Sequence, residues 1–281
     1  MIEEAPATGL RRETEAQPAQ MPGARGTIVV LGDSIAYGWG LLYHQSFPAV
    51  LERLLHEGAT PEGRWRVVNA GVPGDTALMG WARYARDVTP FRPQMVILCF
   101  GLNDAALRRT QFDAQRERLF QAERNAWARL RVILGRVLGG AWSVCAARAG
   151  GRHRGEVRRE PSPRVRPRLF VAALRALVRR ACREGAHVCL MAMTPMSEFI
   201  VSQPQRRVYE RYGGLIQEVC RRERVPLVAW RALGPTFSPE PMLAEDGLHL
   251  TAAGQEWLAA ILYAHLRTKL GRGALSGQRC G

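Results

Sequence analysis

The sequence predicts an α/β protein, a three-layer α/β/α sandwich around a parallel sheet of about five strands. Short apolar runs that end at glycine or proline recur along the chain, and segments with helical spacing of apolar residues lie between them. Strands that alternate with helices build βαβ units, which place their strands in one parallel sheet. The chain of 281 residues is long enough for one large domain. Five such strands fit a flavodoxin-like arrangement.

The first half of the chain supplies three of these strands. Thr27–Leu31 and Met95–Phe100 are apolar runs that stop at Gly32 and Gly101, and Arg66–Asn69 is a shorter run of the same kind. Two helices with apolar residues three and four positions apart are expected at 47–57 and 77–88.

The second half supplies the two remaining strands. Val188–Met193 is apolar and stops before Thr194-Pro195, and Pro226–Ala229 is a short run. Three further helices are expected at 169–183, 205–224 and 252–270. We expect Gly185 to end the first of them, because glycine readily adopts the left-handed conformation that follows many helices.

The stretch 105–168 interrupts this alternation and carries much of the positive charge. Between Asp104 and Arg180 there are 19 arginines against 6 acidic residues, in a chain of net charge +15. We expect an Arg-rich insertion after the third strand, made of a helical cap and a basic loop; a solvated loop and an interfacial anchor are the alternatives. Its charge suits weak contact with an anionic surface. Nucleic-acid binding is not favoured, because no recognisable motif accompanies the charge.

These boundaries predict a flexible tail at 1–25, one domain at 26–271 that contains the insertion 105–168, and a C-terminal tail at 272–281. The N-terminus lacks the basic start and apolar stretch of a secretory signal, and no apolar stretch reaches the length of a membrane span. A cytoplasmic location is expected, with peripheral membrane association as the alternative. The sequence leaves the oligomeric state open.

A serine follows the first predicted strand on a tight turn. Gly32-Asp33-Ser34 presents it at the carboxyl end of the strand, the edge where ligands bind in open α/β sheets. A serine hydroxyl becomes a nucleophile only when a base removes its proton. Asp246-Gly247-Leu248-His249 offers an imidazole and, three residues earlier, a carboxylate that can fix its tautomer. Asp246 is also a candidate helix cap.

Donors for a developing oxyanion are expected at the same edge. A glycine at a strand end lets a backbone N–H approach a reacting oxygen, and Gly71 follows the second strand. Asn103 follows the third strand and brings a side-chain amide, while Ser34 has its own N–H. Because the carboxyl ends of parallel strands share one edge, these groups can converge on one site.

Together these segments resemble the four sequence blocks of the SGNH (GDSL) hydrolases, an esterase and lipase superfamily. The resemblance covers about 27–104 and 169–270. The residues that match its serine, glycine, asparagine, histidine and acid are Ser34, Gly71, Asn103, His249 and Asp246. It implies a serine esterase that forms an acyl-enzyme and needs no cofactor. The implied substrate is an acyl ester of a lipid, a sugar or a small alcohol.

Two other functions stay open at this point. One is an acyltransferase on the same scaffold, and the other is a non-catalytic module that binds anions or nucleic acid through the insertion. No metal site is expected, because the chain lacks the Asp-x-His and Gly-Asn-His motifs of metallophosphoesterases and has no C-x-x-C pair.

Five neighbouring residues receive simpler interpretations. Tyr37 and Trp39 follow the nucleophile and either line the substrate site or pack within the loop. Asp33 and Asp104 are expected to support loops through hydrogen bonds. Asp75 is expected to cap the helix that follows it.

Overall fold

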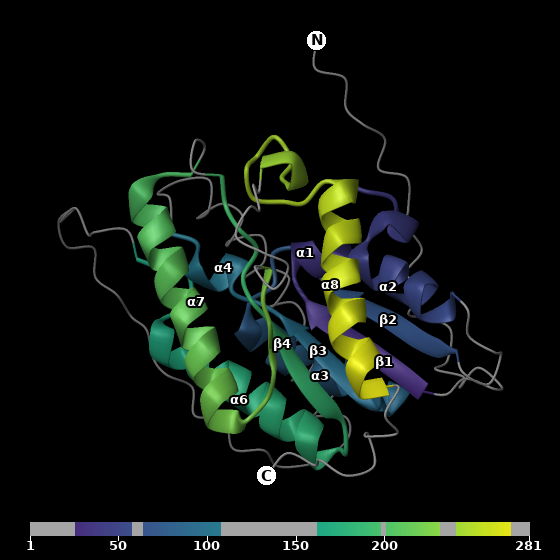
Figure 1. The fold of residues 1–281 in the computed structure, drawn as a ribbon. Coiled ribbons are helices and arrows are strands. Elements are labelled where there is room, and N and C mark those ends of the chain that lie inside the picture. Colours follow the sequence, from purple (N-terminus) through teal and green to yellow (C-terminus); the bar gives the residue numbers. More distant parts are fainter. Residues whose placement is uncertain (1–25, 58–63, 108–161, 198–200, 231–239, 271–281) are drawn as a thin grey trace, which may run out of the picture.

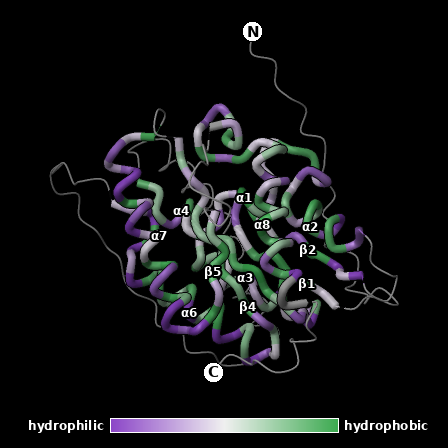
Figure 2. Tube along the Cα trace, viewed as in Figure 1, coloured by the Kyte–Doolittle hydropathy of each residue, from purple (hydrophilic) through white to green (hydrophobic). Residues whose placement is uncertain are grey.

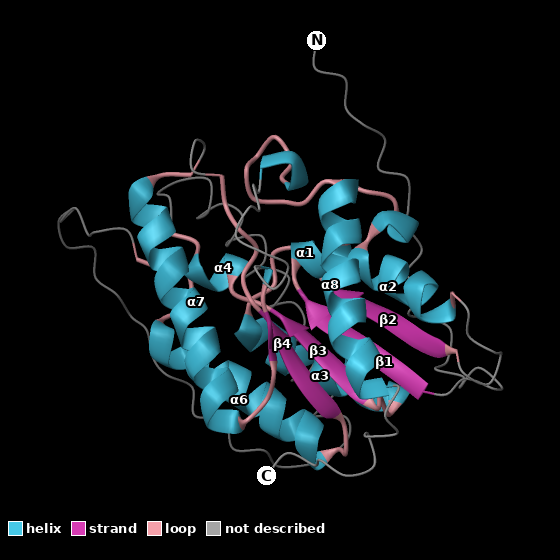
Figure 3. Ribbon diagram, in the orientation of Figure 1, coloured by secondary structure: helices cyan, strands magenta, loops and turns pink. Residues whose placement is uncertain are grey.

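A computed structural model describes residues 26–57, 64–107, 162–197, 201–230 and 240–270. In these ranges five parallel strands form one sheet in the order β2-β1-β3-β4-β5 (Figure 3). The strands are β1 (Gly26–Gly32), β2 (Trp65–Gly71), β3 (Met95–Cys99), β4 (His187–Met191) and β5 (Leu227–Val228). The predicted α/β class with a five-stranded parallel sheet is confirmed.

Helices cover both faces of the sheet (Figure 1). One face packs against α2 (Phe47–His56) and α8 (Ala252–Leu270), and the other packs against α3 (Ala77–Asp87), α6 (Pro167–Arg183) and α7 (Gln203–Glu223). The one-turn helices α1 (Ser34–Tyr37) and α4 (Leu102–Ala105) follow β1 and β3. The 3-10 turns of the described chain are η2 (Tyr43–Gln45), η4 (Thr89–Phe91) and η6 (Glu240–Met242).

Strand β1, which lies between β2 and β3, shows why the interior strands are apolar throughout. Ile28 and Val30 face the cluster under α2 and α8, whereas Val29 and Leu31 face the cluster under α3, α6 and α7, and all four are fully buried. Successive strand residues point to opposite faces, so a strand covered on both sides must be apolar throughout. Figure 2 shows these apolar strands at the centre of the molecule.

Three strands are shorter than the sequence predicts, and the one predicted at Met95–Phe100 ends one residue early, at Cys99. The strand predicted at Val188–Met193 ends at Met191, and the one predicted at Pro226–Ala229 contracts to Leu227–Val228. Parallel pairing between them is limited to two registered pairs at the edge of the sheet, the last being Met191 with Val228. Gly185 follows α6 with φ of 87°, and its N–H donates to the Cys182 carbonyl, as predicted for the end of this helix.

The insertion starts and ends at one place in the fold. Leu107 forms an antiparallel bridge with Pro163. The Arg164 N–H donates to the Ala106 carbonyl at 2.9 Å, and the Val165 N–H donates to the Asp104 carbonyl at 3.0 Å. The chain therefore leaves and returns beside α4. The predicted helical cap, most of the predicted basic loop and both predicted tails lie outside the described residues. The end of the predicted insertion is described, and α6 begins within it, at Pro167.

In the described part of the chain, every helix is too short or too polar to cross a bilayer.

Candidate active site

Ser34 begins the one-turn helix α1, directly after β1. A side chain on Gly32 would approach the Cys99 carbonyl oxygen to 2.8 Å, so the turn requires glycine. The Asp33 carboxylate accepts the Ile35 N–H at 3.0 Å and caps the helix. These contacts hold Ser34 at the carboxyl edge of the sheet.

The imidazole of His249 lies against this serine, although the two are far apart in sequence. His249 Nε2 is 2.9 Å from Ser34 Oγ, and His249 Nδ1 is 2.5 Å from Asp246 Oδ2. An ionised carboxylate can only accept hydrogen bonds, so the Asp246 contact favours the proton on Nδ1 and leaves Nε2 to accept from the Ser34 hydroxyl. The structure therefore brings Ser34, His249 and Asp246 into one hydrogen-bonded chain.

Asp246 also shapes the turn that carries His249. Its Oδ1 accepts the N–H groups of Leu248 at 3.0 Å and of His249 at 2.9 Å. Burial alone would raise the pKa of Asp246, but hydrogen bonds from the His249 side chain and the turn outweigh it and hold this pKa below its ordinary value. The carboxylate is thus ionised at neutral pH and suited to orient an imidazole. It caps a turn that precedes α8 and not the helix itself.

Two predicted oxyanion donors lie beside the nucleophile turn. The Ser34 N–H is at the first position of α1 and donates to no other described residue. Asn103, in α4, donates from Nδ2 to Asp33 Oδ2 at 3.3 Å. Asp33 therefore connects the cap of α1 to the amide of Asn103.

Gly71 is close to the turn, but its N–H is already engaged. It pairs with Gly32 in the sheet register, and a side chain on Gly71 would come within 2.3 Å of the Tyr37 nitrogen. Its N–H donates to Asn69 Oδ1 at 2.9 Å. Close packing of α1 on β2 therefore requires this glycine, independently of any catalytic role. An asparagine two residues before a strand-end glycine is a turn signal that the sequence interpretation overlooked.

The segment after Gly71 is anchored by arginines that sequence reasoning also missed. The Gly74 carbonyl accepts Arg164 Nη1 at 2.8 Å, while the Gly74 N–H donates to no described residue. Asp75 Oδ2 accepts a hydrogen bond from Arg83 Nε at 2.5 Å. The prediction that Asp75 caps α3 is wrong, because Thr76 Oγ1 accepts the N–H of Met79 and performs that function.

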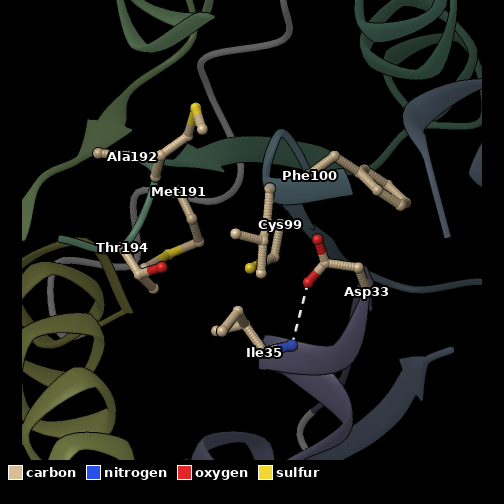
Figure 4. Close-up of a pocket in the computed structure, with 9 residues that line it drawn as sticks. Asp33, Ile35, Cys99, Phe100, Met191, Ala192 and Thr194 are labelled. Carbon is tan, nitrogen blue, oxygen red and sulfur yellow. Dashed lines mark hydrogen bonds between the residues drawn. The ribbon is translucent and has the colours of Figure 1, made fainter. Parts of the chain in front are cut away.

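A small pocket lies behind the nucleophile turn (Figure 4). It is lined by Asp33, Ile35, Cys99, Phe100, Leu102, Met191, Ala192, Met193 and Thr194. Burial in this mostly apolar setting raises the pKa of Asp33 to about 7, although hydrogen bonds from Ile35 and Asn103 oppose the shift. Asp104 is equally buried, accepts the Ala77 N–H and has its pKa raised to about 7. Both acids support loops, as predicted.

The two aromatic residues predicted near the substrate differ in position. The Trp39 ring centroid is 6.3 Å from that of His249, and Trp39 is 46% exposed. Tyr37 is half-buried at the end of α1.

Among the residues that the structure describes, no three His, Cys, Asp or Glu side chains gather closely enough to hold a metal ion.

The amino-acid sequence of this chain matches a known protein family. Residues 30–257 match the model of the GDSL-like Lipase/Acylhydrolase family. Esterase TesA of Pseudomonas aeruginosa is 39% identical over 82 residues, which make up 29% of this chain and 39% of TesA. The match thus spans about two fifths of the length of that curated relative.

Solved structures share the fold at low sequence identity. The lipase/acylhydrolase of Enterococcus faecalis superimposes with a TM-score of 0.58 at 20% identity, over 88% of this chain and 96% of that chain. Axe2, an acetylxylan esterase of Geobacillus stearothermophilus, superimposes with a TM-score of 0.55 at 21% identity, over 89% of this chain and 95% of Axe2. A crystal structure of TesA superimposes with a TM-score of 0.56 at 22% identity, over 86% of this chain and 98% of that chain.

Proposed function

Because this chain belongs to the GDSL-like lipase/acylhydrolase family, we propose that it is a serine esterase that hydrolyses a carboxylic ester through an acyl-enzyme. The hydrogen-bonded chain of Ser34, His249 and Asp246 is the observation that carries the proposal. The substrate is an acyl ester of a lipid, a sugar or a small alcohol. Relatives named as an esterase and an acetylxylan esterase support this substrate class.

In the acylation step, Ser34 Oγ attacks the ester carbonyl carbon and its proton passes to His249 Nε2. Asp246 stabilises the imidazolium that forms. The tetrahedral intermediate then collapses, the bond to the alcohol oxygen breaks, and that oxygen takes the proton from Nε2. The alcohol leaves and the acyl group remains on Ser34.

The negative oxygen of the intermediate needs donors that are already in place. The Ser34 N–H and the Asn103 side-chain amide supply two of them, and each is worth on the order of 3 kcal/mol in the barrier. Gly71 contributes its N–H when the side-chain amide oxygen of Asn69, Oδ1, turns away from it.

Deacylation repeats these chemical steps with water as the nucleophile. His249 Nε2 removes a proton from water, the hydroxide attacks the acyl carbon, and Ser34 Oγ leaves and recovers its proton. The products are the alcohol and the free acid. The proposed steps use only side chains and backbone N–H groups of this chain.

The test is the Ser34→Ala variant. The wild-type protein is expected to hydrolyse p-nitrophenyl acetate and to be labelled at Ser34 by a phosphonofluoridate. The variant is expected to lose at least about 10³-fold in kcat and to take up no label, because residual rate from the remaining site groups is small.

Ser202→Ala is the matched control, because Ser202 is an exposed serine whose side chain makes no capping bond to α7. It is expected to match the wild type in turnover and labelling, and all three proteins should melt at similar temperatures. Undiminished turnover by pure, folded Ser34→Ala protein would exclude the proposed mechanism.

A further inference from the structure

The loop between α1 and α2 holds large apolar side chains in solvent, and one of them, Trp39, lies beside His249 of the hydrogen-bonded triad. Trp39, Leu42 and Tyr43 are 46%, 65% and 50% exposed. In the described part of the chain, Leu78 and Leu169 are the other large apolar residues with comparable exposure. A large apolar side chain that is exposed beside a catalytic site is a candidate for contact with substrate.

Hydrogen bonds fix this loop, so the exposure is imposed by its backbone. The N–H groups of Gly38 and Trp39 both donate to the Ser34 carbonyl at 3.1 Å. The Leu42 N–H donates to Gln45 Oε1 at 3.0 Å. Gly40 takes φ of 81°, and a side chain there would touch nothing within 4 Å, so conformation alone calls for glycine at this position.

Trp39 is the exposed residue of this loop that lies next to the triad. Its ring lies 6.3 Å from the His249 ring, centroid to centroid, with an angle of 36° between the planes. In the proposed mechanism His249 Nε2 delivers the proton to the departing alcohol, so the alcohol portion of the ester must lie on the imidazole side of Ser34. The indole of Trp39, which is 46% exposed next to His249, can offer a flat apolar surface to a ring of the alcohol.

We propose that Trp39 determines specificity for the leaving group, by stacking on an alcohol that carries a six-membered ring with apolar faces. The inference rests on the proposed esterase function and adds the class of alcohol. Sugar esters and aryl esters share this ring chemistry, whereas esters of short open-chain alcohols lack it.

The experiment keeps the acyl group constant and varies the alcohol. Wild-type protein, Trp39→Ala and Trp39→Phe are compared on ethyl acetate, phenyl acetate and an acetylated methyl xylopyranoside. For Trp39→Ala, the ratio of kcat/KM for a ring ester over ethyl acetate is expected to fall about tenfold, equivalent to about 1.4 kcal/mol. Trp39→Phe keeps a ring and is expected to retain most of the ratio. The phenyl and xyloside substrates show which ring is preferred.

A kinetic signature separates leaving-group contact from general damage to the site. All three substrates form the same acetyl-enzyme, and the alcohol has left before water attacks. Trp39→Ala should therefore change acylation, measured as kcat/KM, without a matching change in the common deacylation rate. Ser34 of the variant should still be labelled by a phosphonofluoridate, since fluoride presents no ring.

Leu169→Ala is the matched control, because Leu169 is 50% exposed on α6, whose core face packs on the opposite side of the sheet from α2 and α8. It should reproduce the wild-type ratios.

The proposal is overturned if Trp39→Ala keeps the ring-to-ethyl ratio of the wild type. It is also overturned if all esters slow equally, which would make Trp39 a support for His249. Failure of the esterase proposal looks different: the wild type would hydrolyse none of the esters and Ser34 would stay unlabelled.

Discussion

Asp33 is a residue of the described site whose charged form is opposed by its surroundings. The residue is 1% exposed, and burial raises the pKa of its carboxyl to about 7 from an ordinary value of 3.8. Between these two values the folded state holds a proton that the unfolded chain has released. Folding stability from this group is therefore fully present below about pH 4 and is lost as the pH rises towards 7. Asp104 and Asp75, whose pKa values burial also raises, add effects of the same sign.

We predict that Asp33→Asn flattens this pH dependence. One proton released over this interval changes the free energy of unfolding by about 1 kcal/mol per pH unit. The wild-type protein should lose stability from pH 5 to pH 7, and the slope in the variant should be smaller by about that amount. Denaturant titrations at pH 5, 6 and 7 measure it. Parallel curves for the two proteins would mean that Asp33 is already ionised at pH 5 in the folded state.

At the scale of the element, α3 connects the nucleophile turn to the segment that follows β2. Arg83 projects from α3 with a side chain only 8% exposed. It donates to Asp75 at 2.5 Å, to Asp87 at 2.9 Å and, through Nη2, to the Gly32 carbonyl at 2.9 Å. One guanidinium therefore fixes the residue two positions before Ser34 and the segment that contains Gly74. Its planar array of donors can serve these three acceptors at once.

We predict that Arg83→Met destabilises the protein by roughly 3–5 kcal/mol, because it leaves Asp75 buried without its partner. Arg86→Met is the control on the same helix. Arg86 also contacts Asp87 but is 69% exposed, so its loss should cost under about 1 kcal/mol. Equilibrium denaturation measures both values, and Arg83→Lys, which keeps the charge, should fall between them.

The rate at which a phosphonofluoridate labels Ser34 adds a second measurement for these variants. Labelling should slow in folded Arg83→Met protein, because the Gly32 carbonyl has lost one of its donors, and should be unaffected in Arg86→Met. Equal stabilities for the two methionine variants would show that the buried ion pairs of Arg83 contribute no more than a surface pair.

At the scale of the whole molecule, the sequence determines the sheet and its edge more clearly than the contacts across that edge. Continuous apolar runs predict strands buried on both faces, and the polar residues that follow them lie at one edge because the strands are parallel. The adjacent Asp75 and Thr76 are both favoured caps, so only the structure shows that Thr76 caps α3. Arg83 reaches Gly32 from a different element, and no local pattern encodes such a contact.

The root of the insertion supports a final prediction about the whole chain. Leu107 bridges Pro163, and Arg164 donates to Ala106, so both ends of 108–161 are already neighbours. We predict that the protein with 108–161 replaced by a short Gly-Ser linker still unfolds cooperatively and is still labelled at Ser34. Its free energy of unfolding should lie within about 1 kcal/mol of the wild-type value, because the entropy of loop closure depends weakly on loop length. The deletion removes 13 arginines and 5 acidic residues, so the protein should elute earlier from a cation exchanger. Non-cooperative melting of the shortened protein would instead show that 108–161 contributes to the core, and the predicted division into domain and insertion would be wrong.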